Sequence, residues 1–142
     1  MKNIFNEKNI RFVFNLIGKD YKYNSSDEYD EIYNKIIFKC AVDLVWSGIL
    51  KYNKLTPENY NYWWYETDKP PFKKDNYTFN FADLSLTTKG QLYLALLNSG
   101  KYDFIPLSIF LQYYFCITEG QKYDDILEPL LKKGQIKFNF IN

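Results

Sequence analysis

One residue in five of this 142-residue chain is aromatic, with 14 Tyr, 12 Phe and 3 Trp. Each of these side chains buries a large apolar area, so the chain can build a generous hydrophobic core. A buried Tyr hydroxyl needs a hydrogen-bond partner, and we therefore expect several of the Tyr side chains at the edge of the core. A chain of this length can bury roughly 70% of its unfolded surface without disulfides. The sequence predicts a folded globular protein.

Hydrophobic spacing and turn residues predict a helix-rich α+β fold, a single domain over 1–142 with about five or six helices. The predicted helices cover residues 4–17, 27–51, 57–66, 88–98, 106–118 and 123–133. The helix over 27–51 could instead bend or end near Gly48. Residues 4–17 also alternate as a strand would, although we prefer the helix. The segments 77–82 and 136–140 alternate apolar and polar residues, share a Phe-Asn-Phe pattern, and could pair as strands. We expect a small antiparallel sheet of two or three strands.

The same sequence indicates where the protein works. Its most apolar stretch, 104–117, has 14 residues, whereas a membrane-spanning helix needs about 20. The first residues turn polar before any apolar run develops, so we expect no secretory signal and a cytoplasmic protein. Cys40 and Cys116 lie in apolar surroundings and predict buried free thiols, with a disulfide between them as the alternative. Phe, Tyr, Asn, Lys and Ile make up 70 of 142 residues, and their A/T-rich codons indicate a low-GC bacterium or a mobile element.

Histidine is absent from the sequence. This removes the most common general base near neutral pH and the most common metal ligand. The two cysteines lie too far apart in the sequence for a zinc-site motif, and no glycine-rich nucleotide-binding motif occurs. We therefore expect no catalytic residue, no cofactor and no metal. A histidine-free enzyme that uses carboxylates or lysine, or a binder of small ligands, is an alternative.

Four acidic side chains open the predicted helix over 27–51, and no basic residue lies among them: Asp27, Glu28, Asp30 and Glu31. Ser25 and Glu28 also match a capping box. Negative charge in a first turn suits the helix dipole, which explains the cluster as a helix cap. The same acidic patch could instead face a basic partner protein.

Large aromatic side chains crowd the predicted helix over 57–66, above all at Tyr62, Trp63, Trp64 and Tyr65. Consecutive helical side chains point about 100° apart, so this helix cannot bury them all on one face. The helix could be sandwiched between core elements. Alternatively, the outward aromatics could anchor a partner protein, because Trp and Tyr dominate such contacts. A platform for stacking sugars is a third interpretation.

Residues 84–90 follow the predicted strand over 77–82 and read Leu-Ser-Leu-Thr-Thr-Lys-Gly. This join resembles the passage from wing to helix in winged-helix regulators. The resemblance implies a nucleic-acid-binding regulator, in which a basic recognition helix precedes the wing. Here the preceding segment is aromatic, the net charge is +1, and Arg11 is the only arginine. The low net charge and the single arginine both weaken attraction to phosphates. Nucleic acid is therefore not the partner that we expect.

By elimination, the sequence predicts a non-enzymatic protein-interaction module. In its most concrete form this is a small inhibitor that binds and neutralises another protein, as bacterial toxin-immunity proteins and antitoxins do. The acidic patch suggests a basic, nuclease-like toxin as the partner. The predicted partner-binding residues are Asp27, Glu28, Asp30, Glu31, Tyr62, Trp63, Trp64 and Tyr65.

Overall fold

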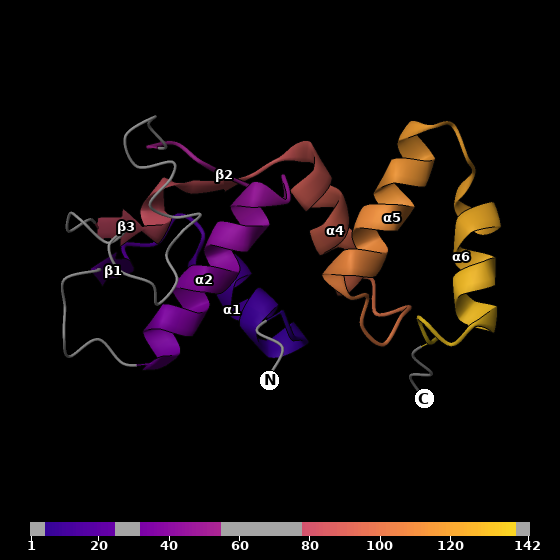
Figure 1. Cartoon of the computed structure of the whole chain (residues 1–142), viewed down its shortest axis with the longest axis horizontal. Coiled ribbons are helices and arrows are strands. Elements are labelled where there is room, and N and C mark those ends of the chain that lie inside the picture. Colours follow the sequence, from indigo (N-terminus) through magenta and orange to yellow (C-terminus); the bar gives the residue numbers. More distant parts are fainter. Residues whose placement is uncertain (1–4, 25–31, 55–77, 139–142) are drawn as a thin grey trace, which may run out of the picture. The chain divides into compact units, whose positions relative to one another are not determined.

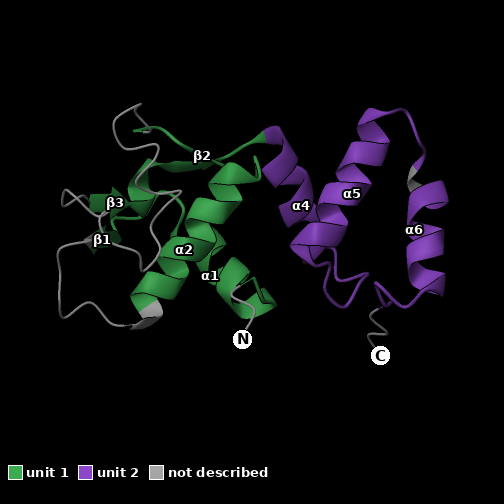
Figure 2. Cartoon of the chain, in the orientation of Figure 1, with its two compact units in different colours: residues 1–87 green, residues 88–142 purple. Residues whose placement is uncertain are grey.

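The computed structural model describes residues 5–24, 32–54 and 78–138. In these ranges it contains five α-helices, one 3-10 helix and two antiparallel two-stranded sheets (Figure 1). This confirms the predicted α+β class. The chain divides into two compact units, 1–87 and 88–142 (Figure 2). The prediction of one domain over the whole chain stays a prediction.

In the described part of unit 1, two α-helices pack against each other, α1 (Glu7–Leu16) and α2 (Ile32–Trp46). At the start of α1, the Asn6 side chain accepts a hydrogen bond of 2.8 Å from the backbone N–H of Asn9. Such a cap satisfies a backbone donor that has no partner within the helix. The helical interpretation of residues 4–17 is confirmed, and the strand alternative is wrong.

Helix α2 is shorter than the predicted helix over 27–51. Gly48 has a φ of +78°, a left-handed conformation that glycine adopts without steric cost and that commonly ends helices. The chain then continues as a strand from Leu50, and both Ile49 and Leu50 are buried there. The sequence left this end open between residue 51 and the region of Gly48, and the structure has the earlier end, at Trp46. Residues 27–31 lie outside the described residues.

Four three-residue strands form the two sheets of unit 1. Their bounds are Lys22–Asn24 (β1), Leu50–Tyr52 (β2), Thr78–Asn80 (β3) and Leu84–Leu86 (β4). Strand β1 pairs with β3, and Tyr23 lies opposite Phe79. Strand β2 pairs with β4, and Lys51 lies opposite Ser85. A 3-10 helix, η1 (Phe81–Asp83), joins β3 to β4.

The strand over 77–82 is confirmed in its central part, but its predicted pairing is wrong. Phe79 pairs with Tyr23, whereas Phe138 forms an isolated bridge with Tyr102. Phe79 and Phe138 thus each meet a tyrosine from outside the two Phe-Asn-Phe segments. Strand β1 was not among the strands predicted from the sequence. A strand of three residues is too short to show an alternating pattern.

Unit 2 contains three helices: α4 (Thr88–Asn98), α5 (Leu107–Thr118) and α6 (Tyr123–Lys132). These bounds confirm the helices predicted over 88–98, 106–118 and 123–133. The ring of Tyr93 in α4 lies 4.5 Å from the ring of Phe110 in α5, measured between centroids. The buried Tyr93 hydroxyl donates a hydrogen bond of 2.7 Å to the carbonyl oxygen of Ile105.

Two further expectations concern the thiols and the membrane. Cys40 and Cys116 are both free thiols, and Cys40 is buried whereas Cys116 is half-buried. The free-thiol prediction is therefore confirmed over the disulfide alternative. Among the described helices, none combines the length and the apolar character that crossing a membrane requires.

Candidate functional site

All the partner-binding residues predicted from the sequence lie outside the described residues. These are Asp27, Glu28, Asp30, Glu31, Tyr62, Trp63, Trp64 and Tyr65. The acidic patch and the aromatic cluster therefore stay predictions. The described residues offer a different candidate site, which lies wholly in unit 2.

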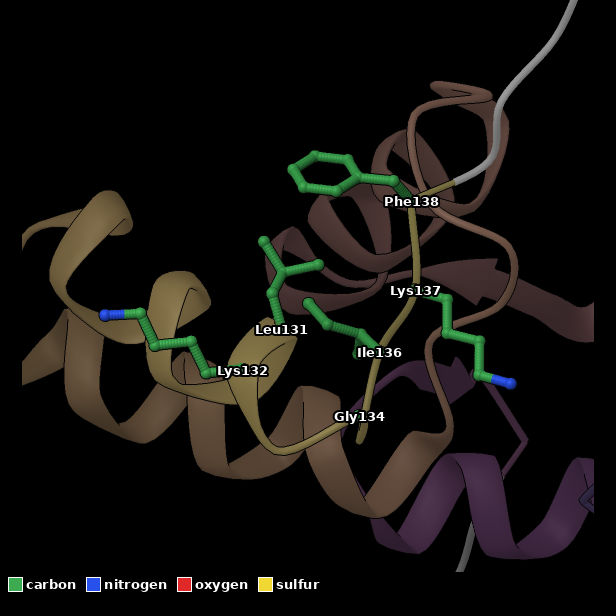
Figure 3. Close-up of a pocket in the computed structure, with 6 residues that line it drawn as sticks. All are labelled: Leu131, Lys132, Gly134, Ile136, Lys137 and Phe138. Carbon is green, nitrogen blue, oxygen red and sulfur yellow. The ribbon is translucent and has the colours of Figure 1, made fainter.

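The candidate site is an open hollow of about 580 Å³ beside the C-terminal end of α6, here called the α6 hollow (Figure 3). Its lining residues are Leu131, Lys132, Gly134, Ile136, Lys137 and Phe138. One wall comes from the last turn of α6, and the other comes from the extended segment that follows.

The turn after α6 positions the two walls. Gly134 has a φ of +71°, which reverses the chain where the helix ends. The N–H of Gln135 then bonds to the carbonyl oxygen of Leu130 at 3.0 Å. Further along, the N–H of Asp103 donates to the carbonyl oxygen of Lys137 at 2.9 Å. The extended segment is thus tied both to α6 and to the loop that precedes α5.

Apolar side chains form the inner surface of the hollow. Leu131 and Ile136 point toward one another, and Phe138 lies on the same side (Figure 3). Ile136 is only 2% exposed, whereas Phe138 is 46% exposed. The Phe138 ring stacks on that of Tyr102, with 5.9 Å between centroids and 21° between planes. One large aromatic side chain therefore stands beside an apolar surface that is open to solvent.

Lysine side chains form the rim. Lys132 and Lys137 extend away from the apolar centre in opposite directions (Figure 3). Lys132 forms an exposed ion pair of 3.4 Å with Glu128, and such pairs contribute at most about 1 kcal/mol. No ion pair within the described ranges involves Lys137 or Lys133. The Nζ of Lys101 lies 5.5 Å from the centroid of the Tyr102 ring. Lysine side chains therefore lie around the hollow, with the carboxylate of Glu128 beside Lys132 and Asp103 in the loop that is bonded to Lys137.

The lining of the α6 hollow carries no hydroxyl, thiol or carboxylate side chain. Lys132 and Lys137 are its only ionisable groups, so it lacks the pair of acid and base that hydrolytic chemistry uses. Elsewhere in the described part of the chain, no cluster of three or more Asp, Glu or Cys side chains could hold a metal ion. The hollow is suited to binding.

Among the described residues, three titratable groups have raised pKa values, and all three belong to unit 1. Burial, aided by the charge of Asp43, raises the pKa of the Cys40 thiol to about 12. Burial also raises the pKa of Asp43, against the opposing effect of Lys39. Burial raises the pKa of Tyr52, although the N–H of Asn80 favours its ionised form. A thiol with a raised pKa is a poor nucleophile, so Cys40 is a packing residue.

The α6 hollow was not predicted from the sequence, which placed Phe138 in a strand over 136–140 and the pair Lys132 and Lys133 at the end of a helix over 123–133. The local signal that could have found the hollow is this lysine pair followed by the alternating Ile136 and Phe138. The contact between Phe138 and Tyr102 joins residues far apart in the chain, and no local pattern predicts it.

Comparisons with protein-family models, with curated proteins and with solved structures found no match to this chain. Any assignment of function therefore rests on the chain's own residues.

The strand pairing bears on the resemblance to winged-helix regulators. A wing is a hairpin of two strands that pair with each other, whereas β3 and β4 pair with β1 and β2. The described residues thus lend the wing no support.

Proposed function

We propose that this chain is a non-enzymatic protein-interaction module, a small inhibitor that binds and neutralises another protein. The observation that supports this most directly is Phe138, 46% exposed at the edge of an apolar hollow. Aromatic side chains in such positions are typical anchors of protein interfaces. Phe115 on α5 is 64% exposed and offers a second aromatic contact in the same unit.

The chemistry of the α6 hollow favours binding over catalysis. An enzyme needs at least two groups placed to move a proton or attack a bond. The hollow offers only the ammonium groups of Lys132 and Lys137, which extend outward from its rim. Its open apolar surface can instead take up a side chain of another protein.

The predicted acidic patch gives the proposal its more specific form. Four carboxylates at Asp27, Glu28, Asp30 and Glu31 would attract a basic protein such as a nuclease-like toxin. The aromatic residues Tyr62, Trp63, Trp64 and Tyr65 would then supply apolar contacts. Such an immunity-like protein would act in the bacterial cytoplasm, where its target must be held inactive.

The proposal is tested by capture followed by reconstitution. The tagged full-length chain is isolated from its native host and washed in salt of about 1 M, which screens weak surface attraction. Captured proteins are then purified separately and mixed with the chain. We expect one protein to form a stoichiometric complex and to lose its activity on binding. Capture of nucleic acid alone, stripped by salt, contradicts the proposal, as does a captured protein that does not rebind.

A further inference from the structure

We infer that the α6 hollow binds an acidic protein segment, in which one large apolar side chain is flanked by carboxylates. The inference rests on the proposed role in protein binding, and it names the chemistry of a partner at a described surface. It does not depend on the predicted acidic patch, which would face a partner of opposite charge.

The apolar part of the hollow sets the central residue of the segment. Ile136 is nearly fully buried, and the more open apolar surface comes from Leu131 and Phe138 on the same side (Figure 3). A Leu or Phe side chain placed here would remove apolar surface from water on both molecules. Because the hollow is open to solvent, it would contact one face of the bound segment and leave the opposite face exposed.

The lysine charges at the rim favour acidic residues on both sides of the apolar residue in the bound segment. Lys137 and Lys133 have no ion pair among the described residues, and Lys132 meets only the exposed carboxylate of Glu128. No carboxylate is among the described residues that line the hollow. Asp or Glu on both sides of the anchor would approach Lys132 at one end and Lys137 at the other. A basic segment would be repelled by the same groups.

The same geometry disfavours a nucleic acid as the occupant. Binding of single strands relies on aromatic faces on which successive bases stack. Tyr102 is only 6% exposed and its ring is already stacked on Phe138. Among the described residues of the hollow, Phe138 is thus the one aromatic side chain that could receive a base.

The test uses the full chain and a fluorescein-labelled peptide, Asp-Glu-Phe-Asp-Glu. One control peptide replaces the acids by Asn and Gln, and another replaces Phe by Ala. Binding is followed by fluorescence anisotropy at low salt. We expect saturable binding of the acidic peptide and at least about tenfold weaker binding of each control peptide.

Two variants and one matched control locate the binding site. Lys137→Glu and Phe138→Ala should each weaken binding of the acidic peptide by about tenfold. Lys122→Glu makes the same change of charge at the N-cap of α6, at the other end of the helix, and should leave binding unchanged. Thermal melting checks that each variant is folded. If Phe138→Ala does not fold, the exposed Lys137→Glu decides the outcome.

Three results would overturn the inference. One is the absence of saturable binding, another is equal loss of binding in Lys122→Glu and Lys137→Glu, and the third is tighter binding of a single-stranded oligonucleotide at the same residues. Failure here is distinguishable from failure of the proposed function. If the chain does not bind the peptide but still rebinds and inhibits its captured partner, the proposed function stands and only the binding role of the α6 hollow is refuted.

Discussion

The ring of Tyr52 is stacked on the ring of Phe79, with centroids 4.4 Å apart and 11° between the planes. Tyr52 belongs to β2 and Phe79 to β3, so this contact joins two sheets that share no strand. The Tyr52 hydroxyl also accepts a hydrogen bond of 3.3 Å from the N–H of Asn80. Phe79 further touches Phe38 and Phe81 edge-on. Phe79 therefore lies at the centre of the aromatic core of unit 1.

Replacing Phe79 by Ala should strongly destabilise the protein. The change removes a fully buried ring and leaves a cavity among three other rings, which costs about 3–5 kcal/mol in free energy of unfolding. Urea denaturation measures the loss. Phe115→Ala, at an exposed site, is the matched control and should cost no more than about 0.5 kcal/mol. Similar losses in the two variants would contradict the assigned core.

Tyr93→Phe should cost about 1–3 kcal/mol, because it leaves the carbonyl of Ile105 buried without its donor. The change removes one oxygen and keeps the ring contact with Phe110. Tyr114→Phe is the control, since this half-buried hydroxyl has no hydrogen bond within the described residues. Thermal melts compare the two variants. An unchanged melting temperature in Tyr93→Phe would show that the hydrogen bond contributes nothing.

The raised pKa of Cys40 predicts a loss of stability in alkali. In the folded chain the thiol keeps its proton up to a pKa of about 12, whereas the unfolded thiol releases it near 9.0. The stabilising effect is fully present below pH 9.0 and is lost as the pH rises toward about 12. Denaturation at several alkaline pH values should show this fall, and Cys40→Ala should lessen it. An equal fall in that variant would assign the effect to other groups, Tyr52 among them.

Asp43→Asn should raise the stability at pH 7. Burial raises the pKa of Asp43, so the charged form is destabilised in the folded state. This group contributes stability below its unfolded pKa of 3.8, and the contribution is lost as the pH rises through the higher folded value. We expect a gain under about 1 kcal/mol at pH 7, with a smaller gain at pH 3. A loss of stability at pH 7 would mean that attraction to Lys39 outweighs the burial.

The helices of unit 2 could be predicted from the sequence, because each joins a long apolar pattern to a clear stop, as at Gly134 after α6. The end of α2 was left open between residue 51 and the region of Gly48. Ile49 and Leu50 continue the helical spacing of the apolar stripe, yet both are buried beyond the helix and Leu50 begins a strand. Burial demands apolar residues in either conformation, so the pattern alone does not separate them. The left-handed conformation of Gly48 ends the helix before these residues.

The candidate site was less predictable than the fold. Phe138 meets Tyr102 across a long stretch of chain, and only the folded structure brings Ile136, Leu131 and Phe138 to one surface. Strand β1 pairs with a segment more than fifty residues further on, which local spacing also cannot predict. The acidic patch and the aromatic cluster were read from local sequence, and they remain predictions.

Titration of the purified partner with this chain tests the claim of a protein inhibitor most directly. The partner's own activity is followed as the chain is added. We predict that activity falls to the background at one equivalent. The chain carrying Asp27→Ala, Glu28→Ala, Asp30→Ala and Glu31→Ala should require at least about tenfold more protein for the same effect, while its melting temperature changes little. A partner that keeps its full activity when this chain is present in excess would contradict the account.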